Sequence, residues 1–217
     1  LNIFRNGLIA PKQITYDSLV LLLNEEDQEL KDKLTERWRD HKLQELNLIG
    51  VVGALLAGAL TSTGSWPKLL ENGNKQPWHV RAFWYSGIVF ALFAVLVAAQ
   101  HSLRLHRLSA HRHGLAYIRS CMMGDLRHDG KKEPRWIQVH AWQASTALLT
   151  LAALCMIAGM TILIWVSTNW GPYKNPRDAW WDENAFLAVV FTVVLGITTG
   201  LVLCSQVSLA VELSEDV

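Results

Sequence analysis

The stretch LNLIGVVGALLAGALTSTGSW, residues 46–66, contains no charged residue and decides the class of fold. A helix needs about 20 consecutive apolar residues to cross the hydrocarbon core of a bilayer, and this stretch has that length. It is also unusually rich in Gly, Ala and Ser for a segment that only has to face lipid. Small residues let helices approach closely, so they predict contact with another helix or with a passage through the membrane.

Three further uncharged blocks follow in the 217-residue chain, at 82–103, 137–167 and 185–211. Charged residues make up 18% of the chain, below the quarter that is usual in soluble domains, and they lie outside these blocks. No segment shows the strict alternation of a strand, and an open sheet cannot sit in lipid. The sequence therefore predicts an all-α integral membrane protein, with a four-helix transmembrane bundle over residues 46–213.

Basic residues are unevenly shared between the connecting segments. Five Lys or Arg residues lie in 31–42 and eight in 104–135, against three in 68–81 and two in 174–177. Because cytosolic loops carry the excess of Lys and Arg, the first two segments and both termini are predicted to be cytosolic. Aromatic residues cluster at the opposite ends of the spans, as at a membrane–water interface. They are Trp66, Trp78, Trp84, Tyr85, Trp165, Trp170, Tyr173, Trp180 and Trp181.

The N-terminal segment, residues 1–45, has a different pattern. Over 17–45, leucines and Trp38 recur at helical spacing, and oppositely charged side chains stand one turn apart. No Gly or Pro interrupts this pattern before Gly50. We expect a cytosolic amphipathic helix that continues into the first span. It packs under the bundle, against a neighbouring subunit, or on the membrane surface, and the sequence leaves these alternatives open.

The segment 104–135 is expected to form a basic cytosolic loop that begins as a helical extension of the second span. Arg104, Arg107 and Arg112 stand just beyond that span, where basic side chains attract anionic lipid. We expect these arginines to bind anionic lipid, or else only to set the orientation of a solvated loop. The histidines of the loop lack the spacing of a zinc site, so no metal is expected.

Two rows of small residues run along the first span. The row with a spacing of four consists of Gly50, Ala54, Gly58 and Ser62. The row beside it consists of Gly53, Ala57 and Thr61. One interpretation is tight helix packing, for which the fourth span also offers a GxxxG pair, Gly196 and Gly200. The other is that the span lines the axis of a pore, with the hydroxyl groups of Thr61, Ser62 and Thr63 near its outer mouth.

Several function classes find no support in the sequence. No Asp, Glu, Lys or Arg lies within a span, which counts against a pump, a proton-coupled carrier or a carboxylate filter. No glycine-rich phosphate loop, nucleophile elbow or HExxH is present, so we expect no enzymatic activity and no cofactor. The expected partners are membrane lipids and further copies of the chain, and no nucleic acid.

Two hypotheses remain for the function. The first is an oligomeric ion channel or pore-like protein with the first span near its axis. The alternative is a non-conducting tetraspan scaffold or accessory subunit, which uses the same small faces for packing and binds lipid or a partner membrane protein.

The segments RWRDHKLQELNLIGVVGALLAGALTSTGSWP and AFWYSGIVFALFAVLVAAQHSLRLHRLSAHRHG carry a resemblance. They lie within 37–114, and this part of the chain resembles uncharacterised four-span membrane proteins of filamentous fungi. The layout is also similar to that of Orai-type calcium channels, which have four spans, cytosolic termini and a basic helix that leads into a glycine-containing first span.

The similarity to Orai-type channels extends to an AW…ST pattern at the start of the third span, matched here by Ala141, Trp142, Ser145 and Thr146. Those channels place a selectivity glutamate at the outer end of the first span, where this chain has the hydroxyl run 61–63. The resemblance therefore implies an oligomer with the first span at its centre, and it does not imply calcium selectivity.

Overall fold

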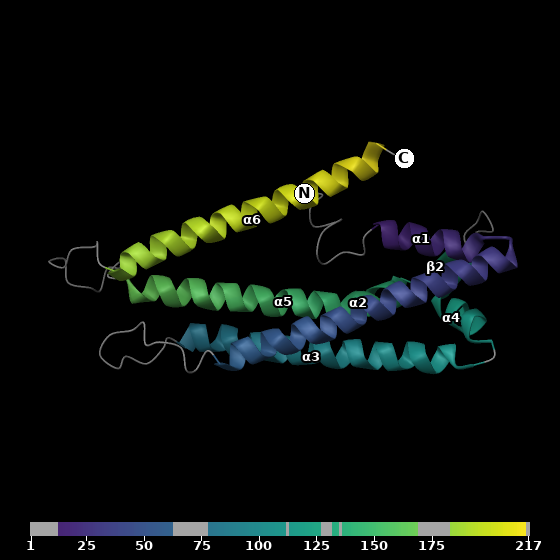
Figure 1. Ribbon diagram of the computed structural model, residues 1–217, viewed down its shortest axis with the longest axis horizontal. Coiled ribbons are helices and arrows are strands. Elements are labelled where there is room, and N and C mark those ends of the chain that lie inside the picture. The colour runs from purple at the N-terminus through teal and green to yellow at the C-terminus, as the bar shows by residue number, and fades with distance from the viewer. Residues whose placement is uncertain are drawn as a thin grey trace. The chain divides into compact units, whose positions relative to one another are not determined.

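A computed structural model describes residues 13–62, 78–111, 113–126, 132–134, 136–168 and 183–215 of the chain (Figure 1). Its elements are α1 (Gln13–Asn24), α2 (Gln28–Ser62), α3 (Trp78–Ser109), α4 (Gly114–Met122), β1 (Met123–Leu126), β2 (Lys132–Pro134), α5 (Trp136–Ser167) and α6 (Glu183–Glu215). Four of these helices, α2, α3, α5 and α6, are long and apolar enough to cross a membrane. The predicted all-α class with four spanning helices is confirmed, and one short antiparallel pairing of β1 with β2 is added to it.

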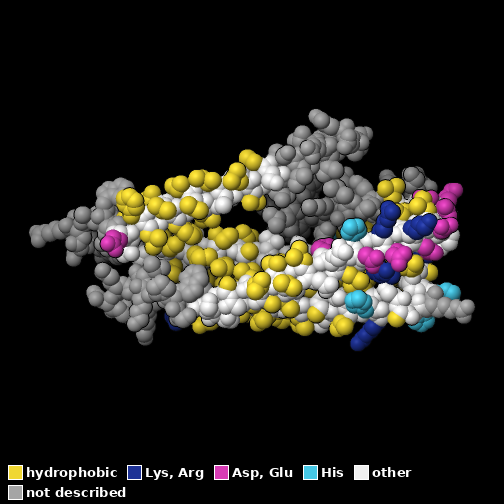
Figure 2. Space-filling view, in the orientation of Figure 1, with side chains coloured by type: hydrophobic (Ala, Val, Ile, Leu, Met, Phe, Trp, Pro, Cys, Tyr) yellow, Lys and Arg dark blue, Asp and Glu magenta, His cyan; other side chains and the backbone are white. Residues whose placement is uncertain are grey.

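The surface of the described residues separates by polarity (Figure 2). Lys, Arg, Asp and Glu side chains gather over the N-terminal part of α2, and hydrophobic side chains cover much of the remaining visible surface. Leu48 and Leu55 are 64% and 70% exposed, and α6 exposes most of its apolar side chains. Contiguous apolar surface of this kind is typical of a protein whose solvent is lipid.

The expected single helix over 17–45 is wrong, because the chain leaves the helical conformation at residues 25–27. Asp27 caps the helix that follows: its Oδ1 accepts a hydrogen bond from the backbone N–H of Glu29 at 3.0 Å. The Lys31 Nζ donates to the backbone carbonyl of Glu25 at 2.5 Å, which satisfies an acceptor just beyond α1. An Asp cap can begin a new helix without a Gly or Pro, so the absence of those two residues did not exclude a break here. From Gln28 onward, α2 continues into the first span as predicted.

The chain forms two compact units, one from residues 1–58 and 89–152 and the other from 59–88 and 153–217. The first unit has an apolar core to which α1 to α5 contribute. Its buried members are Leu19, Leu46, Ile49, Ala98, Leu105, Ile118, Met122 and Val139. A smaller cluster in the same unit joins α2, α3 and α5 through Ala57, Ala91 and Ala152. Because its buried members are alanines, the helix backbones can approach closely, and the partly buried Leu56 and Phe90 pack against them.

In the second unit, α3 and α5 meet at a glycine and an indole. Trp84 is 4% exposed, and a Cβ built on Gly159 would lie 2.5 Å from its Nε1. The indole therefore packs on a helix, whereas Trp78 and Tyr85 are exposed as expected for an interfacial belt. Farther along α5, the Nε1 of Trp165 donates a hydrogen bond to Thr192 of α6 at 3.2 Å.

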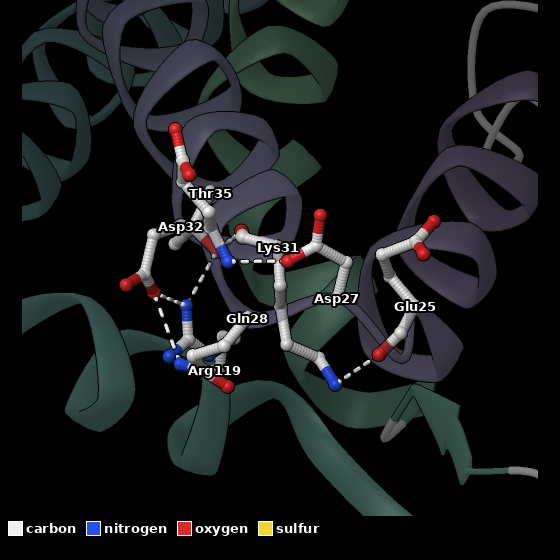
Figure 3. A network of polar contacts seen from close by, with 8 residues as sticks. Glu25, Asp27, Gln28, Lys31, Asp32, Thr35 and Arg119 are labelled. Carbon is white, nitrogen blue, oxygen red and sulfur yellow. Dashed lines mark hydrogen bonds and ion pairs between the residues drawn. The ribbon is translucent and has the colours of Figure 1, made fainter.

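A polar network in the first unit fixes α4 against the start of α2 (Figure 3). Arg119 has a side chain that is only 9% exposed, and its Nη1 donates to Asp32 Oδ1 at 2.5 Å. The same Nη1 donates to the hydroxyl of Thr35 at 3.1 Å. Thr35 is fully buried and donates to the carbonyl of Lys31 at 2.7 Å. A buried guanidinium stays ionised and needs such acceptors, so this network determines where α4 can lie.

Replacing Arg119 by Met is expected to lower the free energy of unfolding by about 2 kcal/mol, because a hydrogen-bonded charge pair is lost and Thr35 loses a partner. The measurement is reversible unfolding in mixed detergent and SDS micelles. Arg37→Met is the matched control, since Arg37 is exposed on the same helix α2. Equal stability of the two variants would contradict a structural role for the network.

Candidate functional site

The two rows of small residues in the first span lie in different environments. Gly53 and Ala57 are buried, together with Leu46, Ile49 and Leu60 of the same helix face. A Cβ built on Gly53 would lie 2.8 Å from Val95 Cγ2 of α3 and 3.7 Å from Leu149 Cδ1 of α5. This row is therefore used for packing inside the chain, as the first interpretation of the small residues predicts.

The other row has open space beside its two glycines. A Cβ built on Gly50 or Gly58 meets no atom within 4 Å, and Ala54 between them is exposed. At about 100° per residue, helical spacing places Asn47 on the same sector, and Asn47 is also exposed. We name Asn47, Gly50, Ala54 and Gly58 the open face of α2.

Bulky aliphatic residues occupy a third sector of α2. Leu48, Val52 and Leu55 are 64%, 41% and 70% exposed, and their spacing places them beside the open face. The span thus has a packing sector, an aliphatic sector and a small, partly polar sector. Of the two exposed sectors, only the aliphatic one has the side chains that are usual on a lipid-facing surface. Contact with lipid therefore does not explain the composition of the open face.

Hydroxyl groups follow at the C-terminal end of α2. Thr61 and Ser62 are exposed, and the Ser62 hydroxyl donates to the backbone carbonyl of Ala59 at 2.8 Å. Thr63, the third residue of the predicted hydroxyl mouth, lies outside the described residues. Thr61 and Ser62 therefore have the exposure that a pore mouth requires, and their lining a pore stays a prediction.

The GxxxG pair of α6 is also exposed. A Cβ built on Gly196 or Gly200 meets no atom within 4 Å. The prediction that this pair packs against a helix stays a prediction.

At the end of the bundle that carries most of the charge, three helices meet through aromatic rings. The ring of Trp142 on α5 lies 5.6 Å from that of Trp38 on α2, edge to face. On its other side it lies 4.8 Å from the imidazole of His101 on α3. The AW…ST pattern includes Trp142, but no local pattern in the sequence predicts its contacts with Trp38 and His101.

A polar contact accompanies these rings. The carboxylate of Glu45 accepts a hydrogen bond from Thr146 Oγ1 of α5 at 3.1 Å and pairs with Lys42 Nζ at 2.8 Å. Lys42 is 8% exposed, so its stem lies in the protein while its ammonium reaches the carboxylate. This contact fixes the rotation of α2 relative to α5 within the first unit.

The expected helical extension of the second span is wrong beyond Ser109. The chain turns there, and a separate helix begins at Gly114. A Cβ at Gly114 would collide with the backbone carbonyl of Leu108, so the close turn requires glycine. The reversal folds α4 back toward α2 and places Ile118 and Met122 in the core of the first unit.

The basic residues of this region have different surroundings. Arg104 and Arg107 are exposed, and neither makes an ion pair with another described residue. Arg112 lies outside the described residues. Arg104 alone lines a small open cleft between α3, α4 and α5. The cleft is lined by Arg104, Leu105, Leu108, Ile118, Cys121, Met122, Gln138 and Trp142.

No family model matches the chain, and no curated protein and no solved structure shows significant similarity to it. The two resemblances noted in the sequence therefore stay predictions. Within the described ranges, no three His, Cys, Asp or Glu side chains come together as a metal site. The four apolar helices define a multi-pass membrane protein, and the small open face of α2 is its candidate functional surface.

The two rows of α2 provide a matched pair of substitutions. Gly53→Leu is expected to lower the free energy of unfolding by about 3 kcal/mol, because its side chain would overlap Val95 and Leu149. Gly50→Leu, one turn away, is expected to change it by less than about 0.5 kcal/mol, since nothing in the chain lies near. The measurement is unfolding of detergent-solubilised monomer. A destabilisation by Gly50→Leu as large as that by Gly53→Leu would contradict the division of the helix into two faces.

Proposed function

We propose that this membrane protein assembles into a homo-oligomeric, channel-like complex in which α2 lies next to the axis. The observation that carries the proposal is the open face: a Cβ built on Gly50 would meet no atom within 4 Å, although the same helix packs tightly at Gly53. Small residues in lipid are typical of close helix contacts, so a second copy of α2 is the simplest neighbour for this face.

The chemistry of the open face supports an axis rather than a plain dimer contact. Asn47, Thr61 and Ser62 supply amide and hydroxyl groups at intervals along this side of the helix, which also carries the exposed Val51. The predicted spans contain no Asp, Glu, Lys or Arg, so a passage along α2 would be lined by hydroxyl, amide and backbone carbonyl groups. Such a lining suits weak, uncharged coordination of a permeant species and does not suit selection by a ring of carboxylates.

The proposal includes an orientation in the membrane. The excess of Lys and Arg over 31–42 and 104–135 favours a cytosolic position for α1, α4 and both termini. The hydroxyl end of α2 would then face the other side.

A second candidate is a non-conducting scaffold or accessory subunit. The exposed Gly196 and Gly200 of α6 favour it, because a GxxxG pair with nothing within 4 Å can receive the helix of a different membrane protein. The two candidates differ in what the small faces contact: copies of the same chain in the first case, and another protein in the second.

The mass of the protein in nanodiscs, measured by native mass spectrometry, tests the proposal. A closed homo-oligomer is expected, and Gly50→Leu and Gly58→Leu are expected to reduce it to smaller species, because leucine on the open face prevents close approach. Val52→Leu is the matched control, since it adds bulk to the aliphatic sector of the same helix.

A monomer or a simple dimer of the wild-type chain would overturn the axial position of α2. If the ring forms, flux into vesicles reconstituted with the ring separates conduction from a scaffold. Ser62→Trp is expected to reduce flux without changing the mass. A closed ring without flux above that of protein-free vesicles would favour the scaffold.

Orientation is tested by cysteine labelling in intact and permeabilised cells, in a variant whose native cysteines are replaced by Ser. Ser120→Cys lies on the exposed side of α4 and is expected to react with a membrane-impermeant maleimide only after permeabilisation. Ser62→Cys is expected to react in intact cells. Labelling of Ser120→Cys, and not of Ser62→Cys, in intact cells would show that the orientation is opposite to the proposed one.

A further inference from the structure

Three aromatic rings that join helices of the first unit include one that can take up a proton. We name Trp38 of α2, His101 of α3 and Trp142 of α5 the ring joint. The ring of Trp142 lies 5.6 Å from that of Trp38 and 4.8 Å from the imidazole of His101. Both indoles also pack against the apolar core of the unit. Of the three rings, the imidazole alone can change its charge near neutral pH.

One nitrogen of this imidazole is buried without a partner. His101 Nδ1 is shielded from solvent and has no hydrogen-bond partner among the described residues. A neutral imidazole carries one proton and can hold it on Nε2, so that Nδ1 is a bare acceptor. An imidazolium carries a proton on both nitrogens, whichever neutral form it comes from. It therefore always buries an N–H donor at Nδ1 that has no acceptor, which costs free energy.

The charges next to the ring joint are positive. Lys42 of α2 is 8% exposed, and both it and Arg104, one turn along α3, interact electrostatically with His101. A further positive charge between two cations is repelled. The carboxylate of Glu45 on α2 is already engaged, by Lys42 Nζ at 2.8 Å and by Thr146 Oγ1 at 3.1 Å.

The other helices that meet here supply no carboxylate. The sequences of α3, α4 and α5 contain neither Asp nor Glu. Near the joint, α5 carries the titratable side chain of His140, and α4 carries Arg119, which is paired with Asp32. An imidazolium at His101 would therefore find its counter-charge only by taking Glu45 from Lys42.

One interaction favours the charged ring. A cation over the face of an indole is attracted by it. The planes of His101 and Trp142 are tilted by 50°, however, so the imidazole does not lie flat on the indole. We expect the unpaired N–H and the two neighbouring cations to outweigh this attraction.

We propose that His101 makes the ring joint an acid-sensitive contact, which holds α2, α3 and α5 together while the imidazole is neutral and loosens when it takes up a proton. Loosening would free the part of α2 around Trp38 from α5. The contact lies within a single chain and does not rest on the proposed oligomer.

The test is unfolding of the full-length protein in mixed detergent and SDS micelles, at about pH 7.5 and about pH 5. The imidazole of the unfolded chain takes up a proton freely, whereas the ring joint resists it, so stability decreases as the pH falls. The equilibrium constant of unfolding is expected to rise on acidification about tenfold more in the wild type than in His101→Gln, which cannot titrate.

Two control variants remove an imidazole from outside the joint. His106→Gln changes an exposed residue of the same helix α3, and His140→Gln changes α5. Both are expected to keep the acid response of the wild type, because the general effect of lost histidine charge is the same in all three variants.

A local measurement separates the joint from the rest of the fold. Ser145 is fully buried on α5, one turn from Trp142. Ser145→Cys, in a chain whose native cysteines are replaced by Ser, is labelled with a maleimide, and the rate is divided by that of the SDS-unfolded protein at the same pH. Acidification is expected to raise this ratio severalfold with His101 present and to leave it unchanged in the double variant with His101→Gln.

An equal acid response of the wild type and His101→Gln would overturn the proposal. A smaller loss of stability in the wild type than in His101→Gln would also overturn it, because the imidazolium would then be favoured by Trp142 or Glu45. Equal loss of the response in His106→Gln or His140→Gln would show a diffuse effect of charge and not a joint. A monomer in nanodiscs would overturn the proposed channel and leave the acid response intact, so the two failures are distinguishable.

Discussion

The close approach of α2 to α3 and α5 at Gly53 is the constraint on which the first unit depends. Lipid provides no hydrophobic force that drives helices together, so contact at short range has to supply the attraction. A Cβ at this position would lie 2.8 Å from Val95, which leaves room for glycine and little else. Because Gly53 and Ala57 face inward, the rotation of α2 is fixed. The open face and the aliphatic sector then follow as the surfaces that remain outside.

Polar contacts at the charged end of α2 complement this apolar packing. Arg119 joins α4 to Asp32 and Thr35, and Glu45 joins α2 to Thr146 of α5. These groups lie near the ends of the apolar segments, where water can solvate whatever the protein does not pair. They fix the position of α4 and the rotation of α2, and the Arg119 contacts also stabilise the unit because that guanidinium is largely buried and hydrogen-bonded. The position of α4 matters because α4 forms one wall of the cleft beside Arg104.

The faces of α2 suit different neighbours. The open face carries no charge and suits another helix, whereas the packing row is used inside the first unit. The open face remains available because the packing inside the unit uses other residues of α2: Ala57 in the alanine cluster, and Asp32 in the contact with Arg119. The ring of Trp142 on α5 contacts Trp38 of α2 and His101 of α3, so it joins three helices of the first unit.

The sequence by itself determined the class of fold, since four long uncharged runs in a chain can be accommodated only as spanning helices. It also determined that small residues matter in the first span, because their spacing is visible without coordinates. Local patterns missed the Asp27 cap and the turn at Gly114, since both depend on individual hydrogen bonds and steric contacts. Only the tertiary structure decided which small row is buried, why Arg104 differs from Arg107, and that Arg119 is paired. Those properties depend on residues far apart in the chain, such as Arg119 and Thr35 at a separation of 84, that meet only when the helices pack.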